Sequence, residues 1–477
     1  MVTEARRNRH DLPTVQAAVA AGHPATVAAG VEILTDGGSA ADAAVAACLA
    51  SCVAETVMTG LLGGGHAIYF DAALGRARNL DCFVAVPGLG AGPRPDAELV
   101  ELEVPFGTEL VHYAVGPASC GVPGVAAGLG TLHAEHGRLP WPRLVEPALR
   151  LARHGVEFPP AHASCLAMLA TVMTMNEGER IYSPRGELLT AGERLEQPGL
   201  ATALALLADE GPRSAYEGSL GEALLALMDE RGGLVTRADL AAYEARWSSP
   251  VELDYLGTGV FTRSGLAPLG DVLHRLPELK RLSEADRAVA LARALDAAEA
   301  HGDTTNLAVV DSDGNACVVT TSLGLGSGDF LPGLDLHLNS MLGEADLIRG
   351  LLAPGARMGS MMSPLVGIDD RGLALAAGAA GGTRLRSALV QVLAGLLDEG
   401  KPPEAAVARP RLHPAAGTVH LEPGFPAEVA TALEHSGFEA RAWPGKHHYF
   451  GGVSVVTRGG AAGDPRRSGA ATTLPRG

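Results

Sequence analysis

Two adjacent threonines, Thr304 and Thr305, stand directly before an alternating apolar stretch at residues 306–310. A second apolar stretch at 316–322 follows the turn residues Asp-Gly-Asn at 313–315, so the pattern predicts two antiparallel strands joined by a hairpin. A threonine hydroxyl is a poor nucleophile at neutral pH, whereas a free α-amine titrates near about 8 and can accept its proton. Cleavage of the chain before Thr304 would create that amine, so Thr304 is a candidate N-terminal nucleophile.

The threonine pair is also compatible with plain strand structure, because threonine is a good strand residue and Asp-Gly-Asn is an ordinary hairpin turn. Seven further motifs, arranged in a fixed order before and after the threonine pair, help to decide between a strand residue and a nucleophile. They are GGSAADAAVA at 37–46, GLLGGGH at 60–66, VPG at 122–124, the segment 141–155, DLAAY at 239–243, SMMSP at 360–364 and GAAGGTR at 378–384. Their order resembles that of the gamma-glutamyltransferase family, in which the chain cuts itself and the exposed threonine becomes the catalytic residue.

The resemblance implies a fold and a division of the chain. The fold is the four-layer αββα sandwich of the N-terminal-nucleophile hydrolases, in the α/β (α+β) class, whereas propensity and periodicity alone predict only a mixed α/β enzyme. Residues 1–303 would form the large segment and residues 304–477 the small one, both in one composite domain. Because each central sheet would contain strands of both segments, the two self-cleaved pieces would stay associated.

Local patterns predict the following elements. Helices are expected at 40–54, 141–154, 197–209 and 383–399, and strands at 67–70, 111–115, 306–310, 316–321, 365–368, 373–377 and 453–457. In the first helix, Ser39 would be the N-cap and Asp42 would lie in the first turn, where the helix dipole favours a carboxylate. The last stretch, 459–477, is rich in Gly, Arg and Pro and is expected to fray.

The resemblance also assigns catalytic roles. Thr304 would be the nucleophile, and Ser322 would be the hydroxyl residue beside it on the next strand. Gly381 and Gly382 match the oxyanion glycines, whose bare backbone lets N–H groups approach a developing negative charge. They also precede a predicted helix, whose N-terminus favours anions. Thr305 would either assist self-cleavage or be a simple strand residue.

The residues expected to recognise the substrate differ from the family pattern. Gamma-glutamyl enzymes have an arginine that pairs with the substrate carboxylate, but the segment DCFVAVP at 81–87 has Phe83 there, and a phenyl ring cannot clamp a carboxylate. SMMSP keeps Ser360 but has Met361 for the second serine. Glycine at 324 replaces an expected asparagine, Asn306 replaces a histidine or aromatic residue, and GLAPLG at 265–270 replaces a PSSGG segment.

The region that would hold the substrate's amine reads LNSMLGEAD at 338–346. Its candidate binding residues are Asn339 and either Glu344 or Asp346. The catalytic set is thus kept while the set that recognises an amino acid is largely rebuilt.

Three functions follow from this division. The first is a self-processing threonine-nucleophile hydrolase or acyltransferase that cleaves a gamma-glutamyl or related small acyl amide through an acyl-enzyme. The second is a carbon–carbon bond hydrolase acting on an amino-acid-derived intermediate of a natural-product pathway. The third is a non-catalytic homologue with a binding role. Retention of Thr304, Gly381 and Gly382 weighs against the third.

The composition of the chain limits the classes of partner that it can bind. With 477 residues, 47% of them hydrophobic, the chain is long enough for a large core. A net charge of −17 and an aromatic content of 4% oppose nucleic acid as a partner. Residues 1–14 are charged and lack the apolar stretch of a secretory signal, and the apolar run at 40–54 is too short to span a bilayer. We therefore expect a cytoplasmic protein that does not bind membranes, and a homodimer is compatible with the sequence.

Cofactor and metal motifs are not evident. We find no G-x-G-x-x-G after a strand and no G-K-[ST], and the six cysteines contain no C-x-x-C pair. Cys48 and Cys52 are one helical turn apart and are expected to be small core residues. The adjacent pair His447 and His448 suggests no third ligand. The sequence therefore predicts no cofactor and no metal.

Overall fold

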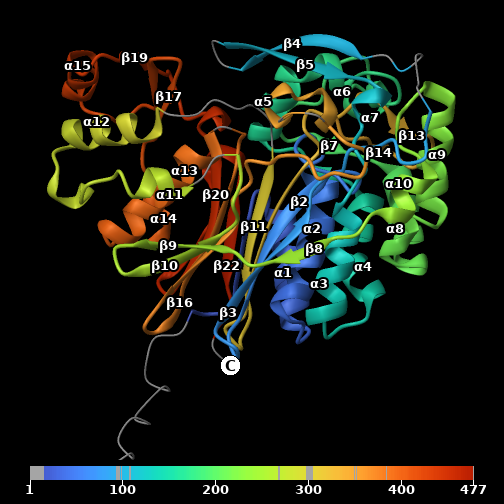
Figure 1. Cartoon of the computed structure of the whole chain (residues 1–477), viewed down its shortest axis with the longest axis horizontal. Coiled ribbons are helices and arrows are strands. Elements are labelled where there is room, and N and C mark those ends of the chain that lie inside the picture. The colour runs from blue at the N-terminus through green and yellow to red at the C-terminus, as the bar shows by residue number, and fades with distance from the viewer. Residues whose placement is uncertain are drawn as a thin grey trace, which may run out of the picture.

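Two β-sheets stacked face to face form the centre of the computed structural model, and helices cover both outer faces (Figure 1). The structure describes residues 15–92, 97, 99–106, 109–266, 269–296, 304–348, 350, 352–382 and 384–475, without the side chains of 105–111 and 346. The charged N-terminal tail and residues 301–303, directly upstream of Thr304, lie outside the described residues.

The first sheet is antiparallel, with the strand order β22-β1-β11-β12-β2-β3-β8. Its strands are β1 (Ala18–Ala21), β2 (Gly64–Asp71), β3 (Arg76–Cys82), β8 (Arg246–Ser248), β11 (Thr305–Val310), β12 (Ala316–Ser322) and β22 (Ala470–Thr473). The second sheet has the order β21-β20-β16-β15-β10-β9 and is also antiparallel. Its strands are β9 (Val251–Tyr255), β10 (Thr258–Thr262), β15 (Leu365–Asp369), β16 (Gly372–Ala380), β20 (Gly452–Thr457) and β21 (Gly460–Ala462).

Each sheet is built from strands on both sides of residue 304. In the first sheet β11, β12 and β22 lie downstream of the predicted cleavage point and are interleaved with four upstream strands. In the second sheet β9 and β10 are upstream strands beside four downstream ones. The two segments therefore share one hydrogen-bonded framework.

Helices form the two outer layers. The first sheet is covered by α1 (Pro24–Thr35), α2 (Ala40–Ala54) and α3 (Val125–His136), with α4 (Trp141–His154), α8 (Pro198–Glu210), α9 (Ser219–Arg231) and α10 (Arg237–Ala242) packed outside or beside them. The second sheet is covered by α11 (Leu269–Leu273), α12 (Glu284–Leu295), α13 (Arg384–Leu393), α14 (Pro403–Ala408) and α15 (Ala427–His435). This is the predicted four-layer αββα sandwich.

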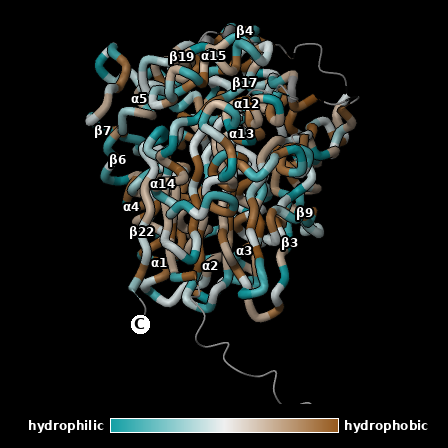
Figure 2. The backbone as a smooth tube through the Cα atoms, turned by 90° about the vertical axis from the view of Figure 1, so that its left-hand side faces the viewer, coloured by the Kyte–Doolittle hydropathy of each residue, from teal (hydrophilic) through white to brown (hydrophobic). Residues whose placement is uncertain are grey.

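Smaller elements surround the sandwich. They are the strands β4 (Val100–Phe106), β5 (Glu109–Val115), β6 (Val156–Glu157), β7 (Arg194–Leu195), β13 (Phe330–Leu331), β14 (Leu336–His337), β17 (Leu412–Ala415), β18 (Thr418–Leu421) and β19 (Glu439–Ala442), and the helices α5 (Pro160–Met168), α6 (Ala170–Met173) and α7 (Gly178–Tyr182). The tube in Figure 2 shows hydrophobic positions gathered toward the interior and hydrophilic ones toward the outside. In the described part of the chain, no helix is both long and apolar enough to cross a membrane.

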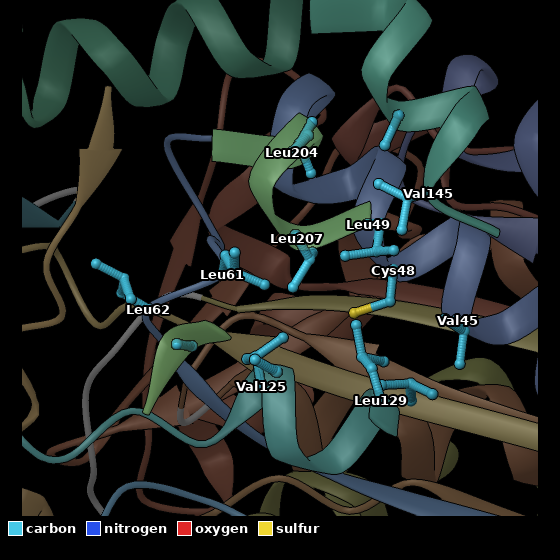
Figure 3. Packing of buried hydrophobic residues seen from close by; sticks show 14 of the residues in the cluster. Val45, Cys48, Leu49, Leu61, Leu62, Val125, Leu129, Val145, Leu204 and Leu207 are labelled. Atoms are coloured by element: carbon cyan, nitrogen blue, oxygen red, sulfur yellow. The ribbon is translucent and has the colours of Figure 1, made fainter. Parts of the chain in front are cut away.

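Helix α2 is buried along its whole length, as predicted. Its small side chains allow close packing against β11 and β12 on one side and α1, α3 and α4 on the other. Figure 3 shows Cys48 and Leu49 among leucine and valine side chains of the neighbouring elements. Ser39 and Asp42 form a reciprocal capping box at the first turn, which satisfies two otherwise unpaired backbone donors. The helix is thus a rigid support under the central strands.

The side chains of β11 and β12 alternate between two environments. Ala308 and Val318 belong to the apolar cluster between the two sheets. Leu307 and Val319 belong to the cluster shared with α2. The same alternation directs Ser322 toward the second sheet and Thr305 toward the helices.

The C-terminal segment is ordered, so the prediction that residues 459–477 fray was wrong for the described residues up to 475. Strand β22 pairs with β1 at the edge of the first sheet, and a 3-10 turn, Pro465–Arg467, precedes it. Buried ion pairs between Arg411 and Asp464 and between Arg466 and Glu422 hold this turn inside the protein. Composition predicted a frayed end because Arg411 and Glu422, the partners of this segment, lie outside it in the sequence.

Most predicted elements are present. The helix predicted at 141–154 is α4 with the same bounds, and the strands at 365–368 and 453–457 are β15 and β20, extended by one residue each. The helix predicted at 383–399 is α13, which gives way to a π-helical turn, Ala394–Asp398.

Candidate active site

Thr304 lies directly before β11, at the end of a central strand of the first sheet. Its side chain reaches across to the second sheet, where the Gly381 backbone N–H donates a 2.7 Å hydrogen bond to Thr304 Oγ1. The residue is 6% exposed. The hydroxyl therefore sits at the junction of the two sheets, in contact with a preset backbone donor.

Gly381 and Gly382 form the turn between β16 and α13. Both have positive φ angles, 123° and 56°, a region that side chains strongly disfavour. A Cβ on Gly381 would lie 2.9 Å from the Cα of Gly451, so close backbone packing also requires glycine. The turn aims a backbone N–H at Thr304 from the start of a helix, where the local field favours negative charge.

Ser322 ends β12, the neighbouring strand, and lines the same pocket as Thr304. Its Oγ accepts a 2.8 Å hydrogen bond from the Gly324 N–H. Gly324 has a φ of 72°, and a Cβ there would lie 2.3 Å from Glu344 Oε1 and 2.7 Å from Ser340 Oγ. A glycine therefore replaces the expected asparagine because Glu344 and Ser340 occupy the space.

A pocket enclosing about 290 Å³ of empty space opens beside Thr304. Its lining combines three hydroxyl residues, one carboxylate and a largely apolar wall. The lining residues are Phe83, Thr304, Ser322, Met341, Glu344, Leu347, Ser360, Met361, Met362, Gly382 and Leu385. The structure thus brings together Thr304, Ser322 and Gly382 with three of the predicted substrate-binding residues, Phe83, Ser360 and Glu344.

Phe83 forms part of the apolar wall at the position where an arginine was expected. Its ring stacks on His66 with a centroid distance of 5.5 Å. Its carbonyl accepts hydrogen bonds from the Tyr243 hydroxyl and from Arg357. A nearby arginine, Arg263, donates to the carbonyls of Ser360 and Met362. Both arginines therefore hold backbone in place, and neither lines the pocket.

Glu344 contributes the carboxylate of the pocket. It is 3% exposed and follows the short turn Met341–Gly343. A carboxylate in a mostly apolar pocket favours a cationic or hydrogen-bond-donating group of a bound molecule. The side chain of Asp346, the alternative candidate, lies outside the described part of the structure.

Asn339 does not line the pocket, which corrects its predicted role in substrate binding. Its amide oxygen accepts from Gly121 N–H at 2.9 Å, and its amide nitrogen donates to the carbonyls of Leu62 and Gly121, each at 2.9 Å. The side chain is fully buried. The Asn339 amide links two loops by binding their buried backbone groups, which need hydrogen-bond partners. Its oxygen and nitrogen are therefore already used within the protein.

Thr305 points away from the pocket, into the helical layer. Its hydroxyl donates to Glu55 Oε2, and Thr26 Oγ1 donates to Glu55 Oε1 at 2.7 Å. Glu55 follows the last residue of α2 and is 1% exposed. Burial raises the pKa of the Glu55 carboxyl to about 7, although both threonine hydroxyls and the charge of Arg467 oppose the shift.

Arg467 completes this second group. Its Nη1 lies 3.3 Å from the carbonyl oxygen of Thr304 and 3.1 Å from Met58 Sδ. Sequence reasoning missed both Arg467 and Glu55, because one lay in a segment expected to fray and the other was read only as a helix end. The available signal was a charged residue directly beside a stretch of apolar or small residues: Glu55 follows the run at 40–54, and Arg467 precedes the run at 468–471.

The two stacked sheets and the helical layers outside them have the fold of the N-terminal-nucleophile hydrolases. A cephalosporin acylase from Bacillus halodurans has the same fold, with a TM-score of 0.79, 22% sequence identity and 97% of each chain covered.

The sequence profile described as gamma-glutamyltranspeptidase matches residues 26–284 and 274–474. An acylase ACY 1 proenzyme of Pseudomonas sp. strain V22 is 30% identical, over 92% of this chain and 89% of its own length. A glutathione hydrolase proenzyme of Pseudomonas aeruginosa is 29% identical, over 92% of this chain and 91% of its own. The chain therefore belongs to the gamma-glutamyltranspeptidase family, which confirms the resemblance carried by the motifs, and it is a hydrolase or acyltransferase.

Proposed function

We propose that this protein cuts itself before Thr304 and then uses Thr304 to hydrolyse or transfer a small, largely apolar acyl group from an amide. The observation that supports this most directly is the hydrogen bond from the Gly381 N–H to Thr304 Oγ1 inside a pocket. Relatives described as an acylase proenzyme and a glutathione hydrolase proenzyme support both the processing and the amide class.

Self-cleavage would begin with attack of Thr304 Oγ on the carbonyl carbon of residue 303. The bond from that carbon to the Thr304 nitrogen breaks, the hydroxyl proton passes to the departing nitrogen, and an ester forms. The acyl shift thus frees the α-amine, and water then hydrolyses the ester, which frees the hydroxyl and leaves a carboxyl group on residue 303. Arg467 holds the Thr304 carbonyl during these steps, so the bonds that change are those on the nitrogen side of the residue.

Substrate turnover would repeat the chemistry with the new amine as base. The amine takes the proton of Thr304 Oγ while the oxygen attacks the acyl carbon, and the protonated amine then gives that proton to the leaving amine. The oxyanion that forms needs donors set in advance, and losing one such donor costs about 2.7 to 4 kcal/mol. The N–H groups of the Gly381 and Gly382 turn, at the start of α13, are the donors we assign to it.

The walls of the pocket indicate the acyl group. Met341, Met361 and Leu385 offer apolar contact, and Glu344 offers one negative charge. Phe83 occupies the position where the family pattern has an arginine, so no guanidinium is present there to neutralise an α-carboxylate. We therefore expect an apolar acyl chain, preferred when it carries an amine that can reach Glu344, and a poor fit for a substrate with a carboxylate near Phe83.

The cleaved pieces are expected to remain one particle. Both sheets contain hydrogen-bonded neighbours from the two sides of residue 304, so separating the pieces would break whole rows of backbone hydrogen bonds.

Denaturing mass spectrometry of the purified wild type beside Thr304→Ala and Thr304→Ser tests the proposal. We expect two fragments divided between residues 303 and 304 in the wild type, an intact Ala variant, and slower but detectable cleavage in the Ser variant, which keeps a hydroxyl. A panel of chromogenic acyl amides then tests turnover by the cut form. An intact wild-type chain after prolonged incubation would disprove the proposed nucleophile.

A further inference from the structure

The buried carboxylate of Glu55 lies on the opposite side of the first sheet from the pocket. It binds Thr305, the residue that follows Thr304. Glu55 accepts hydrogen bonds from Thr26 of α1 and Thr305 of β11. Arg467, from the turn before β22, supplies a positive charge that acts on the carboxyl. Three elements that are distant in sequence thus converge on one acidic side chain.

The backbone at Gly22 packs closely against the Glu55 carboxyl and restricts where it can lie. A Cβ on Gly22 would lie 2.4 Å from Glu55 Oε2 and 3.1 Å from Thr305 Oγ1, so the chain has a glycine where any other residue would displace the carboxyl. Gly22 itself lies between β1 and α1. The contact between Glu55 and Thr305 is therefore enclosed by backbone as well as by side chains.

The group holds the peptide unit that follows the nucleophile from two directions. Arg467 donates to the Thr304 carbonyl, and Glu55 holds the Thr305 side chain. The Thr304 hydroxyl is meanwhile fixed by the Gly381 N–H. With the carbonyl and the next side chain both anchored, little freedom remains in the backbone that carries the hydroxyl.

We propose that Glu55, in its ionised form, is a positioning residue for Thr304 during self-cleavage and acts through Thr305 and Arg467. The inference rests on the proposed self-processing function and adds a controlling group to it. An ionised carboxylate accepts from both threonine hydroxyls and attracts the guanidinium. A protonated carboxyl weakens the attraction to Arg467 and loosens the grip on the Thr304 carbonyl.

The charges around Glu55 make self-cleavage sensitive to pH near neutrality. Burial places the pKa of Glu55 at about 7. On α1, burial lowers the pKa of His23, and on α2, a hydrogen bond with Cys48 and burial raise the pKa of Cys52 well above its usual value. Both groups are thus neutral at pH 7, and Arg467 stays positive. Among these groups facing the site, Glu55 is the one whose charge changes between pH 6 and 8.

A second pocket, enclosing about 790 Å³ of empty space, has His23 and Ser468 in its walls. These residues directly follow Gly22 and Arg467, both of which pack around the carboxyl. This pocket and the Glu55 group therefore share two short stretches of chain, 22–23 and 467–468.

The test follows cleavage of freshly synthesised chain, because in the uncut chain the Thr304 nitrogen belongs to a peptide bond and carries no titratable amine during the first attack. Chain made by cell-free translation is moved to buffers from pH 5.5 to 9, and its cleavage is timed by denaturing mass spectrometry. We expect an inflection near pH 7 in the wild type. In Glu55→Gln we expect no inflection and a rate at pH 8 at least tenfold lower.

Two further variants separate positioning from general damage. Thr305→Val removes the hydroxyl that meets Glu55 and should slow cleavage about tenfold at pH 8. Thr59→Val also removes a buried hydroxyl, one that pairs with Thr321 on the same side of the sheet, and should stay within twofold of the wild type.

The outcomes distinguish the two proposals. A wild type that never cleaves would overturn the proposed function. A wild type that cleaves while Glu55→Gln keeps the same inflection would overturn only the role of Glu55. Should Glu55→Gln fail to fold, as judged by circular dichroism, Thr305→Val decides: cleavage as fast as in Thr59→Val would overturn the inference.

Discussion

The two faces of the first sheet, at the point where β11 begins, differ in how their polar residues are satisfied. On the pocket face, Thr304 meets a backbone N–H and uncharged hydroxyl neighbours beside a cavity. On the helix face, Thr305 meets a buried carboxylate that Arg467 partly compensates. In our proposal the pocket face carries out the attack on a bound carbonyl carbon. The helix face would hold the attacking residue in place, with charges that are costly to bury.

Gly381→Ala should give the largest effect, because it damages the pocket face directly. A Cβ at a φ of 123° and 2.9 Å from the Gly451 Cα would displace the N–H that faces Thr304. We expect kcat for a chromogenic acyl amide to fall about 10²- to 10³-fold, the usual loss of one oxyanion donor. Gly372→Ala is the control, since Gly372 is the first residue of β16, the strand that Gly381 follows, and it also has a positive φ but open space around it. Equal losses in both variants would contradict a specific role for Gly381.

Glu55 should lower the stability of the folded chain as the pH rises. Its folded pKa, about 7, lies above the ordinary value of 4.5, so the protonated form is the one that the fold favours. Its contribution is fully present below about pH 4.5 and is lost as the pH rises through 7. The shift corresponds to about 3 kcal/mol, in order of magnitude.

Urea unfolding from pH 4.5 to 9 measures this term, with Glu55→Gln compared in an uncut Thr304→Ala background. We expect the Gln variant to gain stability relative to its parent as the pH rises, by an amount that levels off above pH 8. A difference between the two that is constant with pH would show that Glu55 does not titrate in this range. The role of Glu55 on the helix face would then come from its packing and hydrogen bonds and not from a change in its charge.

Arg467→Gln should weaken both faces at once, by a smaller factor. The variant loses the donor to the Thr304 carbonyl and the charge that lowers the pKa of Glu55. We expect self-cleavage at pH 7 to slow about 10- to 50-fold, in line with a charged hydrogen bond, and to recover partly at pH 9. Arg458→Gln is a matched control, because it removes an arginine paired with Asp369, away from both faces. A similar slowing in the control would point to general destabilisation.

The sequence predicted the pocket face much better than the helix face, for a physical reason. Strand alternation and the position of a glycine pair before a helix are local patterns, and with the family motifs they singled out Thr304, Ser322 and Gly381, which the structure brings together. The charged residues on the helix face are Glu55, 250 residues from its partner Thr305, and Arg467, 163 residues from the Thr304 carbonyl that it binds. No local pattern encodes such a contact, since the burial of Glu55 and Arg467 depends on how whole layers pack.

The same reason explains the two errors. The C-terminal segment has the composition of a loose tail, and its order depends on the distant partners of Asp464 and Arg466. Asn339 lies in a polar stretch like a binding residue, but its amide is used to join loops. In both cases the residue type was informative, and its partner was not visible from the sequence.

Glu344→Gln should produce the smallest of these effects and the most selective one, because it changes charge on the pocket face without touching Thr304. Paired chromogenic amides, one with an amine on the acyl chain and one without, measure it. We expect KM for the amine-bearing substrate to rise about tenfold, as a charged hydrogen bond becomes a neutral one, with kcat for both and KM for the amine-free substrate little changed. If both substrates suffer equally, Glu344 serves to hold the loop at Gly324, which it closely approaches, and the pocket face would then recognise its substrate by apolar shape alone.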